Sequence, residues 1–465
     1  MPLDSGKHHV VLAGWGRAAH TAATVRRVAD ANDAREAFAA PPQRGVIARG
    51  LGRSYGDAAQ NAGGLVLDAT GLHRIQCFDA TSGTVTAGGG VSLDHLMRTV
   101  IPLGWFPAVT PGTRHVTVGG AIAADIHGKN HHCDGSFAQH VDSLTLVSPK
   151  GSYELTPQRD PELFWATASG MGLTGVVTSA TLRLTPIETS RIRVDSERAP
   201  DLDTVLALMD SGDSAYRYSV AWIDCQARGR KLGRSILGRG EHATLDDLPA
   251  RDRSPERALS FRPSERLKAP PWVPSRVLNR FSVRAFNELW FRKAPRHESG
   301  RVVPLHSFFH PLDGVSDWNR IYGRRGFVQY QFVVPFGPEG EDALRRSLER
   351  LSAAGASSFL AVLKRFGPSS PGMLTFAAPG WTLALDIPAG ISDLSVLLDD
   401  LDDLVAGAGG RIYLAKDGRL RPDLVPVMYS RLDEWREVRS RLDPQGIMRS
   451  DLSTRLRLID EERRD

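Results

Sequence analysis

The stretch between residues 111 and 132 concentrates side chains that could do chemistry. It contains His127 and His131, four residues apart, and a further histidine and a cysteine follow. A metal site would need these side chains on one face. Gly128 disfavours the required helix, no glutamate stands between the two histidines, and the positive charge of Lys129 would repel a dication. We therefore predict no metal, and a cofactor wall or a hydrogen-bonded loop histidine remain as interpretations.

The same stretch is rich in glycine. Glycine lets a backbone bend sharply and lie against a ligand that a side chain would push away. The glycines are Gly112, Gly119, Gly120 and Gly128. Their spacing follows neither a helical nor a strand period, so we predict a wall built against a large flat cofactor.

Residues 45–57 form a second glycine-rich segment, in which a β-branched run leads to Gly50, Gly52 and Gly56. Successive N–H groups in such a loop can bind a pyrophosphate. The Rossmann pattern fails because Tyr55 takes the place of its third glycine, and the Walker A motif is absent. A tight turn between strands explains this loop alone equally well. A third glycine-rich turn at 169–175 makes the combination favour a nucleotide cofactor.

Composition places these loops in an ordinary globular protein. The chain has 465 residues, 41% hydrophobic and 24% charged, and its length suggests about two or three domains. A net charge of +5 spread over the chain is not the concentrated basic face of a nucleic-acid binder. It suits an anionic small molecule or a membrane surface better.

The three cysteines, Cys77, Cys133 and Cys225, form no C-x-x-C pair, which is consistent with a reducing compartment. The sequence shows no signal peptide, and no segment approaches the roughly 20 apolar residues that span a bilayer. We expect a cytoplasmic protein, or one peripheral at the inner membrane or cell envelope.

The elements that position the loops change along the chain. Before about residue 187 the glycine loops alternate with strands at 64–68, 84–88, 142–148 and 176–184 and with a helix at 93–100 that Ser92 can cap. Afterwards, strand-like segments at 216–224, 327–334, 358–367 and 381–386 predict an antiparallel sheet. Alternation puts Gln329 and Gln331 on one face and Tyr330 on the other. Helices are predicted at 396–405 and around Trp435.

Between the first two of these later strands lies an unusual stretch, 252–299, rich in Arg, Pro and Ser. It also carries the aromatics Trp272, Phe281, Phe286, Trp290 and Phe291. A mobile surface excursion is one interpretation. The other is an amphipathic lid that meets a polyprenyl tail or a membrane surface, its arginines pairing with lipid phosphate.

Four motifs carry a family resemblance: Arg-Gly-Leu-Gly-Arg-Ser-Tyr-Gly-Asp at 49–57, Pro-Gly-Thr-Arg-His-Val-Thr-Val-Gly-Gly-Ala-Ile at 111–122, Asp-Ile-His-Gly-Lys-Asn-His-His at 125–132 and Gly-Leu-Thr-Gly at 172–175. Together they resemble the PCMH-type FAD domain of the vanillyl-alcohol oxidase superfamily, and more narrowly the actinobacterial decaprenylphosphoryl-β-D-ribose 2-oxidases. The resemblance implies an α+β fold. Its FAD-binding domain would comprise residues 1–187 and a C-terminal return, 408–465, around an inserted antiparallel-sheet substrate domain, 188–407, with a mobile loop at 252–299.

The resemblance also implies which residues bind FAD, and that the flavin is held non-covalently. The pyrophosphate would contact Ala48, Arg49, Gly50, Leu51, Gly52, Arg53, Ser54, Tyr55, Gly56, Asp57 and Ala58, supported by Gly112, Thr117, Val118, Gly119 and Gly120. The flavin and its ribityl chain would contact Ala124, Asp125, Ile126, His127, Val177 and Tyr413.

Catalytic and substrate-binding residues follow from the resemblance in the same way. The predicted catalytic residues are His127, Lys416 and Gln331. The predicted substrate-binding residues are Lys364, Gln329, Trp222, Thr382, Ala384 and Phe366. His127 and Lys416 are both candidates for handling the hydroxyl proton or stabilising a developing oxyanion, and the sequence does not assign these roles. Mycobacterial members carry a cysteine in place of Ala384, a change that alters pocket chemistry without requiring a change in turnover.

The implied function is FAD-dependent oxidation of the 2-hydroxyl of a polyprenylphosphoryl-β-D-ribose. This is the first half of an epimerisation that makes the arabinose donor for cell-wall arabinan. A separate NADH-dependent keto-reductase would be the partner enzyme, peripheral membrane contact is expected, and nucleic acid is not. Two alternatives stay open: a sugar or alditol oxidase with a soluble substrate, and a catalytically silent flavin- or lipid-binding subunit.

Overall fold

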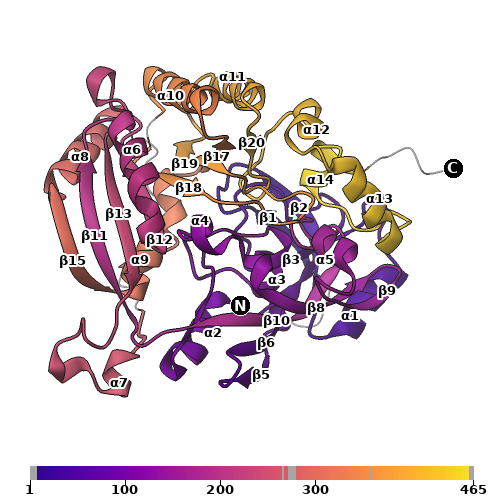
Figure 1. Ribbon diagram of the computed structural model, residues 1–465. Helices are drawn as coiled ribbons and strands as arrows, with labels where there is room; N and C mark the ends of the chain where they lie inside the picture. The colour runs from indigo at the N-terminus through magenta and orange to yellow at the C-terminus, as the bar shows by residue number, and fades with distance from the viewer. Residues whose placement is uncertain (1–7, 264–266, 271–278, 357, 460–465) are drawn as a thin grey trace.

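The computed structural model describes residues 8–263, 267–270, 279–356 and 358–459. The chain forms three main sheets, with helices packed around them (Figure 1). Two sheets come from the N-terminal part and the third from the middle of the chain. The mixture of helices and sheets is the α+β class predicted from the sequence.

The first sheet has the strand order β1-β2-β4-β3: β1 (His8–Ala13), β2 (His20–Arg27), β4 (Leu65–Asp68) and β3 (Val46–Arg49). Strands β2, β4 and β3 run parallel, whereas β1 pairs with β2 antiparallel. Helix α1 (Ala31–Ala39) begins at Asp30, whose carboxylate accepts hydrogen bonds from the backbone of Asn32 and Asp33. The loop after β3 is the predicted pyrophosphate segment, so it leaves the carboxyl end of a buried parallel strand.

The second sheet is antiparallel, with β5 (Ile75–Asp79), β6 (Thr84–Gly88), β10 (Val176–Pro186), β8 (Val141–Ser148) and β9 (Gly151–Leu155) side by side. The short β7 (Trp105–Pro107) pairs with the end of β10. Helix α2 (Leu93–Val100) confirms the predicted helix, since Ser92 Oγ accepts from the His95 N–H and the four apolar side chains of the helix are buried. Helices α3 (Val118–Ala123) and α5 (Pro161–Thr167) complete this part.

The third sheet has eight strands, and its neighbouring strands are antiparallel, as predicted. Its order is β15 (His297–Pro304), β11 (Arg191–Ala199), β13 (Ser235–His242), β12 (Tyr218–Ile223), β18 (Ala361–Phe366), β19 (Gly380–Pro388), β17 (Phe327–Val334) and β20 (Arg411–Ile412). Helices α10 (Pro338–Ala353) and α11 (Leu394–Gly407) pack beside β17 and β19. Strand β20 belongs to the segment after residue 407, so this sheet extends beyond the predicted substrate segment.

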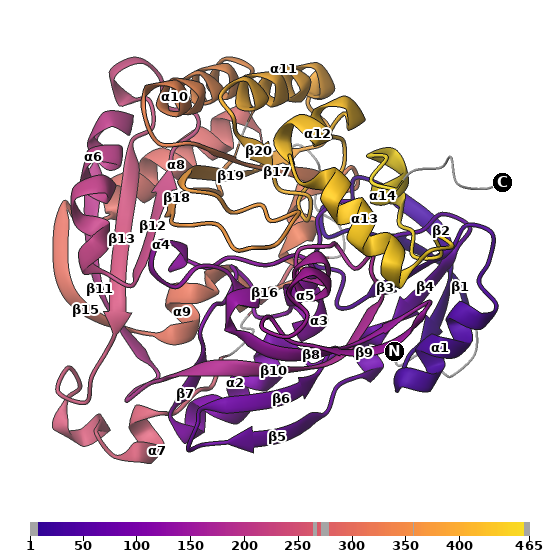
Figure 2. The same cartoon turned by 45° about the vertical axis from the view of Figure 1, so that its right-hand side comes forward.

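The end of the chain returns to the beginning (Figure 2). It forms α12 (Val425–Met428), α13 (Leu432–Leu442) and α14 (Asp451–Arg455). Trp435 is fully buried and donates its indole N–H to Ala166 O at 3.0 Å. Arg455 holds the carboxylate of Asp57 at 2.9 Å. These contacts join residues that are 269 and 398 positions apart in the sequence.

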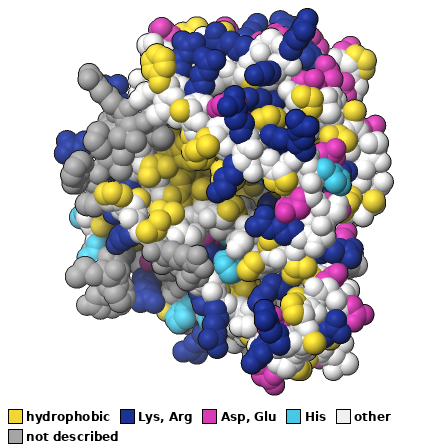
Figure 3. Space-filling model, turned by 90° about the vertical axis from the view of Figure 1, so that its left-hand side faces the viewer, with side chains coloured by type: hydrophobic (Ala, Val, Ile, Leu, Met, Phe, Trp, Pro, Cys, Tyr) yellow, Lys and Arg dark blue, Asp and Glu magenta, His cyan; other side chains and the backbone are white. Residues whose placement is uncertain are grey.

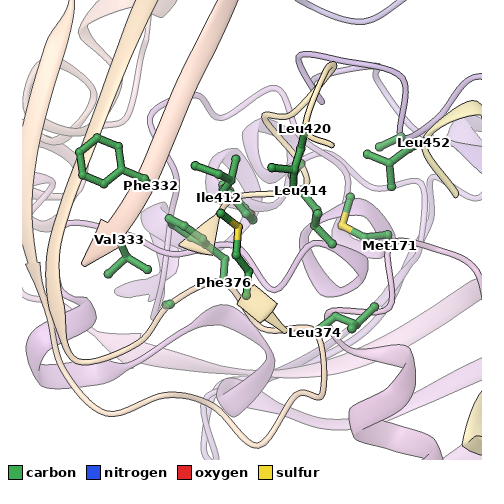
Figure 4. Close-up of a cluster of buried hydrophobic side chains, with 14 of the residues drawn as sticks. Met171, Phe332, Val333, Leu374, Phe376, Ile412, Leu414, Leu420 and Leu452 are labelled. Atoms are coloured by element: carbon green, nitrogen blue, oxygen red, sulfur yellow. The ribbon is translucent and has the colours of Figure 1, made fainter. Parts of the chain in front are cut away.

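A shared core joins the parts (Figure 4). Met171 comes from the third glycine-rich turn, Phe332 from β17, Phe376 from the loop before β19, and Leu414 and Leu452 from the C-terminal segment. Their burial removes apolar surface from water, which stabilises the contact between segments by roughly 1.5–3 kcal/mol for each fully buried large side chain. The cavity described below is therefore walled by elements that one core holds together.

Much of the predicted mobile loop, 252–299, has regular structure. It contains α7 (Pro255–Ala258), β14 (Leu267–Lys268), α8 (Arg280–Lys293) and the beginning of β15. Helix α8 was not predicted from the sequence, although Asn279 caps it by accepting from the backbone of Phe281 and Ser282. Trp272 lies outside the described residues.

Candidate active site

A cavity of about 1160 Å³ lies between the glycine-rich loops and the eight-stranded sheet. Ordinary ligand pockets have volumes of about 300–1000 Å³, so this one has room for a dinucleotide and part of a substrate. Its wall contains Gly50 and Gly52 from the first loop, Gly119 from the second and Gly175 from the third. The structure thus brings together the three loops that the sequence singled out.

Two glycines show why the wall needs them. A Cβ added at Gly50 would lie 2.2 Å from Thr117 Oγ1, because the first and second loops touch there. A Cβ at Gly112 would meet no protein atom within 4 Å, and this residue lines the cavity. Thr117 also begins α3 by accepting from the Gly120 N–H at 3.2 Å. These backbones form a cradle that fits a nucleotide cofactor, since the side chains that would fill it are missing.

Most of the predicted FAD-binding residues line this cavity. They are Ala48, Gly50, Leu51, Gly52, Arg53, Ser54, Tyr55, Ala58, Gly112, Thr117, Gly119, Gly120, Ala124, Ile126, His127, Val177 and Tyr413. Whether each contacts the cofactor remains a prediction.

Five predicted FAD-binding residues do not line the cavity. Arg49 donates to the carbonyls of Ala13 (2.7 Å) and Ala59 (3.0 Å), which fixes the first loop from behind. Gly56 packs against the backbone of Asp417, where a Cβ would come within 1.8 Å of the carbonyl oxygen. Asp57 is bound by Arg455, and Val118 is fully buried in the core. These residues support the loops.

Asp125 is the fifth, and its side chain points away from the cavity. Its carboxylate accepts hydrogen bonds from Ser370 Oγ, from Thr375 Oγ1 at 3.1 Å and from the Ala138 N–H at 3.1 Å. Its backbone φ is +38°, a conformation that few side chains adopt. Asp125 therefore anchors the loop that carries Phe376. Asp125 lies two residues before His127, which lines the cavity.

His127 is buried in the wall and held by Gln331. Gln331 Nε2 lies 3.0 Å from His127 Nε2 and 3.3 Å from Thr382 Oγ1. Thr382 donates its only hydroxyl hydrogen to Phe332 O at 2.8 Å, so its oxygen can only accept from Gln331. The Gln331 amino group is thereby assigned as donor to both neighbours. Thr382 positions Gln331 from outside the cavity lining.

This arrangement fixes the tautomer of His127. Burial, with further contributions from Lys364, His131 and Lys416, lowers the pKa of His127 well below its usual range, so the ring is neutral. Because Nε2 accepts from Gln331, the ring hydrogen resides on Nδ1, which has no hydrogen-bond partner in the described chain. An unpaired buried donor of this kind is costly. It fits a group supplied by a bound molecule.

Three lysines with pKa values lowered by burial share the cavity with His127: Lys129, Lys364 and Lys416. Burial lowers the pKa of Lys416 to about 7, with Asp386 acting to raise it and Lys364 to lower it further. Burial lowers the pKa of Lys364 to about 8, and burial with the charge of Lys364 lowers that of Lys129 to about 7. The ammonium of Lys416 lies 3.8 Å from the centroid of the Tyr55 ring.

The other predicted substrate residues divide between the cavity and its support. Trp222, Gln329 and Ala384 line it, and Trp222 donates its indole N–H to Phe359 O at 3.1 Å. Phe366 lies behind it, packed edge-on against His127 with ring centroids 4.7 Å apart. Tyr413 donates its hydroxyl to Ala124 O at 2.9 Å and stacks on Phe376.

Three residues of this site were not predicted from the sequence. Lys129 was considered only as an argument against a metal, although its place in the His-Gly-Lys motif was a signal. Asp386 is fully buried, and burial raises its carboxyl pKa to about 7 although Gln329 donates to it at 2.6 Å. Its position at the end of the predicted strand 381–386 was visible in the sequence, but its hydrogen bond with Gln329 was not. Phe376 lies in a loop that carried no pattern.

A cradle of glycine-rich loops beside a neutral histidine and partly desolvated lysines defines the class of an FAD-binding oxidoreductase. Residues 22–156 match the family described as an FAD binding domain, and the cavity wall supplies its cofactor site. The chain is 43% identical over 457 residues, 96% of its length and 97% of the relative's, to the decaprenylphosphoryl-β-D-ribose oxidase of Mycolicibacterium smegmatis. It belongs to the decaprenylphosphoryl-β-D-ribose oxidase family.

Two other relatives differ in how much of the chain they match. An uncharacterised protein of Streptomyces coelicolor is 42% identical over 79% of the chain and 100% of its own length. The alditol oxidase of a Streptomyces species is 30% identical over only 38% of the chain and 42% of its own length. The match to the alditol oxidase thus covers less than half of either chain, whereas the match to the decaprenylphosphoryl-β-D-ribose oxidase covers almost the whole of both chains.

Proposed function

We propose that the protein oxidises the 2-hydroxyl of a polyprenylphosphoryl-β-D-ribose to the 2-keto sugar. One observation carries this proposal beyond the family membership: Lys129, Lys364 and Lys416 converge on one cavity, and no ion pair joins any of them to a carboxylate in the described part of the chain. Amines without a carboxylate partner, which carry positive charge when protonated, suit an anionic substrate. A phosphodiester-linked sugar supplies that charge, whereas an alditol does not.

FAD, when bound, supplies the hydride acceptor for the ring carbon. The protein must then hold the sugar and receive the hydroxyl proton. His127 is a poor base in this arrangement, because Gln331 occupies Nε2 and Nδ1 carries the hydrogen. It is a fixed neutral donor that can orient the sugar oxygen or an atom of the cofactor.

Lys416 is the better candidate for the base. With a pKa of about 7, the Lys416 amine is unprotonated in about half of the molecules at neutral pH, whereas an ordinary lysine would be almost wholly charged. The fixed position of its Nζ over Tyr55 limits its freedom. We assign proton removal to Lys416 and oxygen positioning to His127 and Gln331.

The remaining lysines would bind the phosphate. Lys364 lies on β18, and the carbonyl oxygen of Lys129 accepts from the Ser219 N–H of the neighbouring β12, so the two lysines reach the cavity from adjacent elements. The Lys129 ammonium donates to Phe308 O and lies 4.1 Å from the centroid of that ring, which holds it in place. A bound phosphate would restore their charged forms.

The wider role follows from the chemistry. A 2-keto sugar is the product, and an NADH-dependent keto-reductase acting next would complete inversion at that carbon, giving the arabinose donor for cell-wall arabinan. FAD is held non-covalently in this proposal, and Ala384 on β19 leaves the pocket without a thiol at that position.

A substrate panel tests the proposal. A short-chain prenylphosphoryl-β-D-ribose should be oxidised with a kcat/KM at least a hundredfold above that of free ribose or an alditol. Preference for an alditol would favour the soluble-substrate oxidase. If the protein retains FAD but substrate does not reduce this flavin under anaerobic conditions, the result would instead support a catalytically silent subunit. Acid precipitation should release the flavin into the supernatant, and yellow pellets would contradict non-covalent binding.

A further inference from the structure

Helix α8 presents its apolar side chains to the outside. Phe281 is 81% exposed, Leu289 67%, Trp290 46% and Phe286 44%, whereas Val283 and Asn287 of the same helix are buried. At 100° per residue the four apolar side chains span about half of the helix circumference. Surface helices of globular proteins normally turn such a face inward. A contiguous exposed apolar face of this kind marks an interaction site.

The inner side of α8 already contacts the rest of the protein, and these contacts prevent the helix from rotating to bury its outer face. Asn287 donates to Asp224 Oδ1 at 2.8 Å, and Arg234 holds Glu288 at 2.7 Å. The Arg234 guanidinium also lies 4.9 Å from the centroid of Phe291. These polar and cation–π contacts fix the helix to the eight-stranded sheet, so its outer face keeps one orientation.

Basic residues accompany the apolar face. Arg280, Arg284 and Lys293 form no ion pair in the described chain, and Arg292 pairs only with Glu288, which it shares with Arg234. On the side of the molecule that carries α8 and β15, Figure 3 shows hydrophobic side chains bordered by Lys and Arg side chains. Aromatic and cationic side chains together are the composition of helices that lie in a membrane interface.

The apolar face is continuous with the active-site cavity. Phe286, Trp290 and Lys293 line that cavity, which also contains Gln331 and Lys416. The exposed Phe281 and Leu289 continue the same helix face outward. Among the described residues, no helix has the length and apolar character to cross a membrane. Contact along a bilayer surface is the mode that this helix can provide.

We propose that the outer face of α8 docks on an anionic lipid bilayer and turns the mouth of the active-site cavity toward the membrane. The choice of a bilayer over a protein partner rests on the unpaired cations around the aromatics, which complement lipid phosphates. The consequence for catalysis rests on the proposed function: a prenyl chain could stay in the bilayer while its sugar phosphate enters the cavity past Phe286 and Trp290.

The test measures binding of the FAD-loaded protein to vesicles of phosphatidylglycerol and phosphatidylcholine by co-sedimentation. We expect binding to vesicles that contain phosphatidylglycerol, weakened by salt because exposed charges contribute. The double variant Phe281→Ser/Leu289→Ser should lower the partition coefficient at least tenfold. The matched control is Val396→Ser/Val427→Ser, which removes exposed apolar side chains from α11 and α12 and should bind as the parent does.

Activity separates this proposal from the proposed function. Phe281 and Leu289 do not line the cavity, so the double variant should turn over a soluble short-chain substrate at the parent rate. It should lose at least tenfold on a long-chain substrate embedded in vesicles. Equal vesicle binding by parent and double variant, or no binding by the parent, would overturn the docking proposal whether or not the substrate is turned over. Retention of the parent by a keto-reductase alone, without vesicle binding, would also overturn it.

Discussion

Replacement of Lys416 by methionine should remove the proton acceptor while leaving the cavity filled. The pKa of this lysine falls from 10.5 to about 7, so its unprotonated fraction at pH 7 is about half instead of roughly 1 in 3000. General-base catalysis contributes about 10²–10⁴ in rate, which corresponds to roughly 3–5 kcal/mol of transition-state stabilisation. We expect Lys416→Met to lower kcat/KM within that range.

The pH dependence makes this prediction specific. In the parent, kcat/KM should rise tenfold per pH unit below about 7 and level off above it, because only the unprotonated amine accepts a proton. The assay is anaerobic reduction of the bound flavin by a short-chain prenylphosphoryl ribose in a stopped-flow instrument. The reasoning would be refuted if Lys416→Met kept the rising limb, since another group would then be the base.

The remaining predictions concern the neighbours of Lys416. Asp386→Asn removes the charge that raises the pKa of Lys416, so the rising limb of kcat/KM should move to lower pH; no shift would show that the carboxylate does not reach the amine. Lys364→Met removes a charge that lowers the same pKa, so the limb should move to higher pH, while KM for the phosphorylated sugar rises about tenfold in steady-state assays. Gln331→Leu should lower kcat by 10–100-fold in flavin-reduction kinetics, and parent-like rates would exclude its orienting role. Gly50→Val should weaken FAD retention on gel filtration, because its Cβ would meet Thr117 at 2.2 Å.

Local patterns in the sequence predicted much of the fold. Alternation in 327–334 identified β17 and the shared face of Gln329 and Gln331, and both amides line the cavity. Ser92 and the spacing of apolar residues identified α2. These signals succeed because burial and hydrogen-bond requirements act within a few residues along the chain.

Other features depend on contacts between distant segments. Asp125 stands in a conspicuous motif, but only the fold shows that its carboxylate binds Ser370 and Thr375 instead of facing a cofactor. Helix α8 was hidden by its arginines and exposed aromatics, which contradict the usual inward apolar face. The lowered pKa of Lys416 comes from burial by several elements, a property that no single stretch carries.

The most direct test of the account is a kinetic isotope effect at the ribose. A short-chain prenylphosphoryl-β-D-ribose carrying deuterium at C2 should slow anaerobic flavin reduction several-fold, and the product should be the 2-keto sugar. Deuterium at C3 should leave the rate unchanged. An isotope effect at C3, or none at C2 with oxidation elsewhere on the sugar, would contradict the assignment of this protein as a 2-oxidase of a polyprenylphosphoryl ribose.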